Sequence, residues 1–120
     1  DLVSYNPAKE TARQVKALID DFYNSSKALN NEIKALGFST KQMVGIFKQE
    51  YGLTPKNYMD TLRIEQAKRL LGETNDDIID IAFSVGFNSI STFYRFFKKF
   101  TGKSPSVYRK ENANDKDCLL

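Results

Sequence analysis

The chain of 120 residues is 41% hydrophobic and 28% charged, with a formal net charge of +3, which is the composition of a folded globular domain. No apolar run approaches the roughly 20 residues of a membrane span, so no membrane partner is expected. Because the chain has no histidine and one cysteine, neither a zinc site nor a His-based catalytic machine is expected. Carboxylates remain as possible catalysts, but no motif pairs them around a site, so the sequence predicts no metal site, no cofactor, no catalytic residue and no enzyme.

The first half of the chain predicts three helices, the first over residues 8–24. Its apolar residues recur at the spacing of one buried helical stripe: Val15, Leu18, Ile19, Phe22 and Tyr23. A short helix over 27–36 is expected to end at Gly37. The third helix covers 39–51, with Ser39 as its N-cap and Gly52 at its end.

The second half predicts four more helices. A long helix covers 54–71 and ends at Gly72, and at roughly 1.5 Å per residue it is on the order of 27 Å long. Helices over 78–85, 89–100 and 105–111 follow, the first of them capped by Asp77. Residues 112–120 are expected to be a disordered tail. Since no stretch alternates with the period of two that marks a strand, the predicted fold class is all-α with about seven helices.

The two halves carry an internal repeat. At a constant offset of 50 residues, the sequence pairs Phe47-Lys48 with Phe97-Lys98, Gly52 with Gly102, Pro55 with Pro105 and Tyr58 with Tyr108. Gly37-Phe38 echoes Gly86-Phe87 with one residue of slippage. Each copy has the pattern helix, glycine turn, helix, glycine, capped helix. We therefore predict a first subdomain over 1–53, a linker helix over 54–72 and a second subdomain over 73–111.

Charge is distributed unevenly along the chain. Residues 86–110 contain no Asp or Glu and six basic residues: Arg95, Lys98, Lys99, Lys103, Arg109 and Lys110. Residues 73–80, in contrast, are acidic. A one-sided basic segment is the electrostatic footprint of a protein that binds a polyanion. On charge alone, a solvated basic face without a partner is an equal alternative.

The predicted helix over 89–100 has two different faces. Phe93, Phe96, Phe97 and Phe100 form an apolar stripe, interpreted as core packing rather than as a membrane-surface helix. On the opposite face, the planar fork of Arg95 can reach guanine O6 and N7. The residues expected to face DNA bases are Ile90, Ser91, Thr92 and Arg95, and those expected to face phosphates are Ser89, Lys98, Lys99 and Lys103. For Lys98 and Lys99, the helix dipole is an equally good explanation.

The repeat maps the same faces onto the helix over 39–51. The residues expected to face bases are Lys41, Gln42, Val44 and Gly45, and those expected to face phosphates are Ser39, Lys48 and Gln49. Gly45 costs a helix interior roughly 1 kcal/mol relative to Ala. Either the backbone must approach a partner closely at this position, or this helix contacts DNA weakly.

The chain resembles the AraC/XylS family of bacterial transcription regulators over about residues 30–110. The resemblance rests on the run Leu62-Arg63-Ile64-Glu65-Gln66-Ala67-Lys68-Arg69-Leu70-Leu71, on Ile78, Ile81-Ala82, Gly86-Phe87, Phe93 and Arg95-Phe96-Phe97-Lys98-Lys99, and on Gly102 and Ser104-Pro105-Ser106-Val107-Tyr108-Arg109. In the family an Arg commonly stands where this chain has Gly45. Ile33 stands where the second copy has Ala82. Ile90 is apolar at a position that is often polar, so it either touches a thymine methyl group or packs at the core edge.

The resemblance implies two tandem helix-turn-helix subdomains joined by the long helix. Each would place a recognition helix, 39–51 or 89–100, in one of two successive major grooves of double-stranded DNA. It further implies transcription regulation, usually activation, in the bacterial cytoplasm at the nucleoid, with RNA polymerase as a partner. A separate effector or dimerisation domain is expected on the N-terminal side. The lone Cys118, which has no partner for a disulfide within the chain, independently favours a reducing compartment. The start at Asp1, without an initiator Met, fits a fragment of such a longer protein.

The main alternative is a protein-interaction module that keeps the duplicated fold but has lost base contacts. Gly45 and the modest net charge favour this alternative, whereas the acid-free basic segment argues against it. Salt dependence separates the two, because DNA binding weakens steeply as rising salt removes the gain from counterion release.

Overall fold

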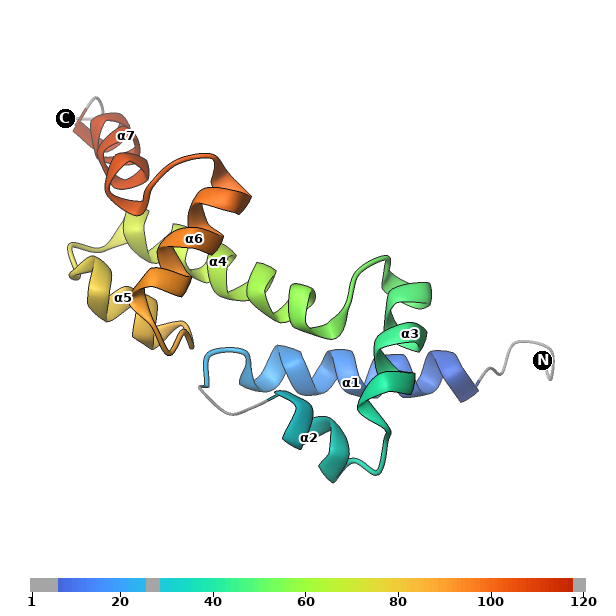
Figure 1. Ribbon diagram of the computed structural model, residues 1–120. Helices are drawn as coiled ribbons and strands as arrows, with labels where there is room; N and C mark the ends of the chain where they lie inside the picture. The colour runs from blue at the N-terminus through green and yellow to red at the C-terminus, as the bar shows by residue number, and fades with distance from the viewer. Residues whose placement is uncertain (1–6, 26–28, 118–120) are drawn as a thin grey trace. The chain divides into compact units, whose positions relative to one another are not determined.

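The computed structural model describes residues 7–25 and 29–117, with side chains described up to residue 112. Over these residues it contains seven α-helices and no strand (Figure 1). The helices are α1 (Pro7–Phe22), α2 (Leu29–Ala35), α3 (Thr40–Tyr51), α4 (Pro55–Glu73), α5 (Ile78–Ser84), α6 (Ile90–Thr101) and α7 (Pro105–Asp117). The predicted all-α class with two tandem helix-turn-helix units is confirmed.

The helices form two compact units. Among the described residues, unit 1 comprises 7–23 and 29–59, and unit 2 comprises 24–25 and 60–117. The division falls inside α4, between Met59 and Asp60, so the first turn of this helix belongs to unit 1 and the rest to unit 2. The long helix therefore contributes to the core of each unit, where the sequence analysis treated it as a separate linker.

The internal repeat extends to individual backbone hydrogen bonds. The Gly52 amide donates to the Lys48 carbonyl at 2.8 Å, and the Gly102 amide donates to the Lys98 carbonyl at the same 2.8 Å. Four of the five glycines predicted to end helices have φ between 78° and 112°: Gly37, Gly52, Gly86 and Gly102. Glycine occupies this left-handed region without steric penalty, which favours the ends of the helices that precede these four positions.

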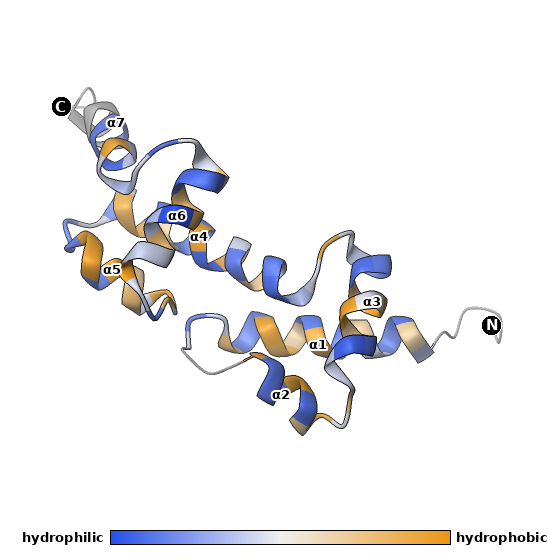
Figure 2. Cartoon of the chain, viewed as in Figure 1, coloured by the Kyte–Doolittle hydropathy of each residue, from blue (hydrophilic) through white to orange (hydrophobic). Residues whose placement is uncertain are grey.

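Each unit has its own apolar core. The bands of colour along α1 in Figure 2 show its alternation of polar and apolar residues, and its apolar face packs mainly on α3. The buried apolar residues of unit 1 are Ala12, Val15, Ile19, Leu29, Ile33, Met43, Phe47 and Met59. The core of unit 2 comprises Ile64, Ala67, Leu71, Ile81, Ala82, Val85, Phe87, Phe93 and Phe97.

A polar contact joins α1 to the first turn of α4 within unit 1. The Tyr58 hydroxyl donates to the Asp20 carboxylate, and the Lys16 ammonium lies 3.2 Å from the same carboxylate. Hydrogen bonding to Tyr58 and Asp20 raises the pKa of Lys16, and burial raises the pKa of Tyr58. This contact holds the helix that follows α3 against α1.

Three helices continue past their predicted ends, α6 by the single residue Thr101. The prediction that α4 ends at Gly72 is wrong, because the helix reaches Glu73, and the Thr74 hydroxyl then donates to the Leu70 carbonyl at 2.7 Å. The predicted disordered tail is wrong for residues 112–117, since α7 runs to Asp117. No proline or glycine follows Pro105 to stop this helix. The remainder of the predicted tail, including Cys118, lies outside the described residues.

Gly102, in the left-handed region, and Gly72, inside a helix, predict opposite effects of substitution by alanine. Gly102 has φ of 78° and Gly72 is helical, and a Cβ added at either position meets nothing within 4 Å. Gly102→Ala should therefore lower the free energy of unfolding by about 1–2 kcal/mol, the cost of a left-handed alanine. Gly72→Ala should raise it by up to about 1 kcal/mol. Urea denaturation measures both, and a destabilised Gly72→Ala would contradict the helix end described here.

Candidate nucleic-acid interface

The rotation of α6 about its axis is set by two phenylalanines one turn apart. Phe93 and Phe97 are both 0% exposed, and their ring centroids lie 5.6 Å apart. Phe97 also meets Tyr108 of α7 edge-on, with 5.5 Å between the centroids. The side chains on the opposite side of the helix therefore face outward, and the exposed ones are Ser91, Arg95, Lys98 and Lys99.

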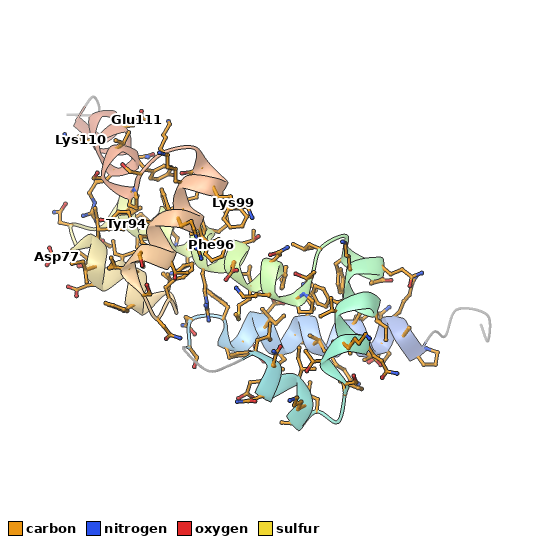
Figure 3. The ribbon with its side chains drawn as sticks, in the orientation of Figure 1. Asp77, Tyr94, Phe96, Lys99, Lys110 and Glu111 are labelled. Atoms are coloured by element: carbon orange, nitrogen blue, oxygen red, sulfur yellow. The ribbon has the colours of Figure 1, made fainter. Side chains whose placement is uncertain are left out.

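The aromatic stripe of α6 is only partly core. Phe96 is half-buried and Phe100 is 42% exposed, so the interpretation of all four phenylalanines as core packing is wrong for Phe100. Figure 3 shows Phe96 and Lys99 on α6, and the Lys99 ammonium lies 6.0 Å from the centroid of the Phe96 ring. The Arg95 guanidinium lies 5.5 Å from the same ring. The outer aromatic ring thus supports two of the exposed cations.

The start of α6 is held by a side-chain cap. Ser89 is the N-cap residue, and its hydroxyl accepts a hydrogen bond from the Thr92 amide at 3.3 Å and lies 2.9 Å from the Ser91 hydroxyl. Thr92 is half-buried, which leaves less of its side chain outward than the helical pattern predicts. Ile90 is also half-buried and packs against the core of unit 2. Of the two alternatives given for this residue, it therefore takes the position at the core edge.

As on α6, two buried side chains one turn apart set the rotation of α3 about its axis. Met43 and Phe47 are 1% and 0% exposed, and Phe47 lies 5.8 Å from Tyr58, the counterpart of Tyr108. The residues of this helix that were expected to face DNA are all exposed: Lys41, Gln42, Val44, Gly45, Lys48 and Gln49. Ser39 is the exposed N-cap residue of α3, but its side chain makes no cap hydrogen bond.

Two of the six basic residues in segment 86–110 have roles inside unit 2. Lys103 forms an ion pair with Glu111, which follows the acid-free segment directly. Arg109 donates hydrogen bonds at 3.3 Å to the carbonyls of Leu71 and Thr74 and so caps the end of α4. The outward positive charge of α6 itself therefore comes from Arg95, Lys98 and Lys99.

Sequence reasoning missed a buried arginine. Arg63 of α4 is 8% exposed, donates to the Ser25 carbonyl at 2.9 Å and lies 5.5 Å from the centroid of the Phe87 ring. Burial lowers the pKa of Arg63. The signal that could have identified Arg63 was its position in the run of residues 62–71, which carries the family resemblance. Its contacts position Phe87, which precedes α6 in the chain.

A second surface of unit 2 is acidic and apolar. Ile79 and Phe83, one turn apart on α5, are 54% and 49% exposed. Together with three exposed acidic residues they form what we call the α5 surface: Asp76, Asp77, Ile79, Asp80 and Phe83. Asp77 and Lys99 are well separated in Figure 3. The sequence analysis did not predict that these two apolar side chains face outward.

The described part of the chain contains no group of three His, Cys, Asp or Glu side chains that could hold a metal ion. None of its helices has the length and the apolar character needed to cross a membrane.

The two N-caps predict a difference between the copies. Ser89→Ala removes the hydroxyl that accepts from the Thr92 amide, so the free energy of unfolding should fall by about 1 kcal/mol. Ser39→Ala removes no cap hydrogen bond and should change it far less. Thermal and urea denaturation of the two variants measure this difference. Equal losses would show that Ser39 caps α3 in solution.

Comparison with known proteins gives consistent matches. A protein-family profile described as "Helix-turn-helix domain" matches residues 33–111. The melibiose operon regulatory protein of Escherichia coli K12 is 35% identical over 97 residues, covering 81% of this chain and 32% of that protein. The Msm operon regulatory protein of Streptococcus mutans is 35% identical over 112 residues, covering 93% and 40%. The chain thus spans well under half the length of these relatives.

Solved structures agree in fold. The C-terminal domain of AraT, a response regulator from Geobacillus stearothermophilus, superposes with a TM-score of 0.81 at 28% identity over 88% of both chains. The DNA-binding domain of AdpA, solved in complex with a target DNA, has a TM-score of 0.77 at 21% identity, covering 94% of this chain and 98% of that one, and shares the fold. With a family profile over most of its length and these relatives, the chain belongs to the AraC/XylS family of transcription regulators, as its tandem helix-turn-helix DNA-binding domain.

Proposed function

We propose that α3 and α6 are the recognition helices of this transcription regulator and bind successive major grooves of double-stranded DNA. One observation supports this most directly: the buried pair on each helix turns a row of polar side chains outward. On α6 this row carries Arg95, Lys98 and Lys99, and the helix contains no acidic residue. A row of cations without acids complements the phosphates that line a major groove.

The proposed base contacts divide between the two helices. On α6 they are Ile90, Ser91, Thr92 and Arg95, and on α3 they are Lys41, Gln42, Val44 and Gly45. Arg95 lies near the middle of its helix, beside the short side chain of Ser91, so its guanidinium can extend to guanine O6 and N7. Ile90 and Thr92 are half-buried, and their share of the contacts is accordingly smaller than that of Arg95.

The proposed phosphate contacts flank the base contacts. They are Ser39, Lys48, Gln49, Ser89, Lys98, Lys99 and Lys103. Lys103 would have to exchange its ion pair with Glu111 for a phosphate, and an exposed ion pair of this kind is worth little in water. The hydroxyl of Ser89 accepts a hydrogen bond from the Thr92 amide, and its own proton can be donated to a phosphate oxygen.

We also propose that the regulator activates transcription by contacting RNA polymerase through the α5 surface. Three carboxylates next to two exposed apolar side chains would be repelled by DNA but suit a basic protein surface. The exposed Ile79 and Phe83 supply the apolar area that a specific protein contact needs.

The full-length protein is proposed to carry an effector or dimerisation domain on the N-terminal side. The length of the relatives supports this, since the chain corresponds to 32% and 40% of two of them. The protein would act in the bacterial cytoplasm at the nucleoid, where its DNA lies. No catalytic role is proposed, because the relatives compared are described as regulators.

Two substitutions on α6 separate base contact from phosphate contact. Arg95→Ala should cost about 1–3 kcal/mol on a selected site and little on a mixed-sequence duplex, because a base contact depends on sequence. Lys98→Ala should weaken binding to both duplexes equally and reduce the slope of log K against log salt by about 1. Fluorescence anisotropy at several salt concentrations measures both. Absence of binding even at low salt would instead favour the protein-interaction module.

The α5 surface predicts a variant with normal DNA binding and reduced activation. Asp80→Asn in the full-length protein should lower transcription from a reporter several-fold, because it removes a charge that RNA polymerase would meet. The DNA affinity of the variant, measured by anisotropy, should equal that of the wild type. Unchanged transcription from both Asp80→Asn and Phe83→Ala would refute this role of the α5 surface.

A further inference from the structure

Gly45 has no structural reason within the chain to be a glycine. It lies exposed in the middle of α3 and is absent from the glycines with positive φ. A Cβ added to it meets nothing within 4 Å. Glycine in a helix interior costs roughly 1 kcal/mol relative to alanine. Since the fold neither requires nor benefits from this glycine, we look for its role in what α3 binds.

Four long polar side chains surround Gly45 on the helix surface. Residues three and four positions away are neighbours on an α-helix, and for Gly45 these are Lys41, Gln42, Lys48 and Gln49, all of them exposed. Val44, beside it in the chain, is 37% exposed. The centre of the outward face of α3 thus lacks a side chain, while its rim carries two ammonium and two amide groups.

The second unit differs in side-chain size at the centre of this face and at the N-terminal part of its rim, while Lys98 and Lys99 are as long as Lys48 and Gln49. The counterpart of Gly45 is Arg95, the largest side chain on the outward face of α6. The counterparts of Lys41 and Gln42 are Ser91 and Thr92, which are short. A helix with a long central side chain contacts a base with that side chain, whereas a helix with an empty centre must contact bases with its backbone or its rim.

We propose that α3 contacts A·T base pairs, with the methyl group of a thymine seated against the backbone at Gly45. The major groove displays this methyl group, and glycine permits close approach of a helix backbone to it. The amide of Gln42 suits N6 and N7 of adenine, and Lys48 and Gln49 suit the flanking phosphates. The inference rests on the proposed placement of α3 in a major groove, and it assigns guanine contact to α6 and thymine contact to α3.

The test begins with duplexes selected from a random library by the 120-residue chain. Arg95→Ala should remove the base preference in one block of the selected site, which identifies the block bound by α6. The other block should contain at least one thymine at which deoxyuridine, which lacks only the methyl group, weakens binding about fourfold, the equivalent of burying one methyl group.

Gly45→Ala then provides the decisive comparison, because the new methyl group occupies the same space. It should weaken binding to the thymine duplex several-fold, and the deoxyuridine duplex should restore the affinity, while the free energy of unfolding rises. Gly72→Ala is the matched control: it also replaces a helical glycine with open space around it, and DNA affinity should not change.

Three outcomes would overturn the inference. Gly45→Ala could bind the selected duplex as tightly as the wild type, deoxyuridine could have no effect at any thymine of the block, or Gly45→Ala could weaken both duplexes equally. The last result would mean close backbone approach without thymine contact. If the wild type selects no sequence and shows no salt-dependent binding, the proposed function itself fails, which is a different result from these three.

Discussion

Burial of two side chains one turn apart on α3, and of two on α6, is the constraint on which the outward faces of this domain depend. Met43 and Phe47 on α3, and Phe93 and Phe97 on α6, are almost completely buried. Two anchored positions fix how far a helix is rotated about its axis, and rotation decides which side chains face outward. Each anchor is reinforced by a tyrosine of the following helix, Tyr58 or Tyr108.

Much of the fold could be predicted because the chain marks its helix ends with residues that have few alternatives. A glycine with positive φ and a proline at a first helical position have specific backbone requirements, and Gly52, Pro55, Gly102 and Pro105 recur at one offset. The same offset predicted both recognition helices. Gly72 misled because it is an ordinary helical residue, which local sequence does not distinguish from a helix-ending glycine.

The surface was harder to predict because exposure depends on which elements lie nearby. The amphipathic pattern places Phe100 on the apolar side of α6, but no neighbour covers 42% of its surface. Arg109 contacts residues 35 and 38 positions away, and Lys103 pairs with Glu111 eight positions along the chain, so composition counted both among the groups available to DNA. Ile79 and Phe83 face outward for the same reason.

The two copies of the unit share a backbone pattern and differ on their outward faces. α6 carries three exposed cations and no acid, whereas α3 carries Lys41 and Lys48 together with the exposed Glu50. We infer that the second unit supplies more of the salt-dependent affinity, because each phosphate contact contributes through counterion release. The first unit would then contribute mainly through shape and amide contacts around Gly45.

The most direct test of this account is an NMR titration of the nitrogen-15-labelled chain with duplex DNA. Because the buried pairs fix the rotation of both helices, amide shifts should change along the outward faces of α3 and α6, at Gly45, Gln49, Arg95 and Lys99. The α5 surface should change little. Large shifts on the α5 surface, with α6 unaffected, would contradict the placement of the recognition helices.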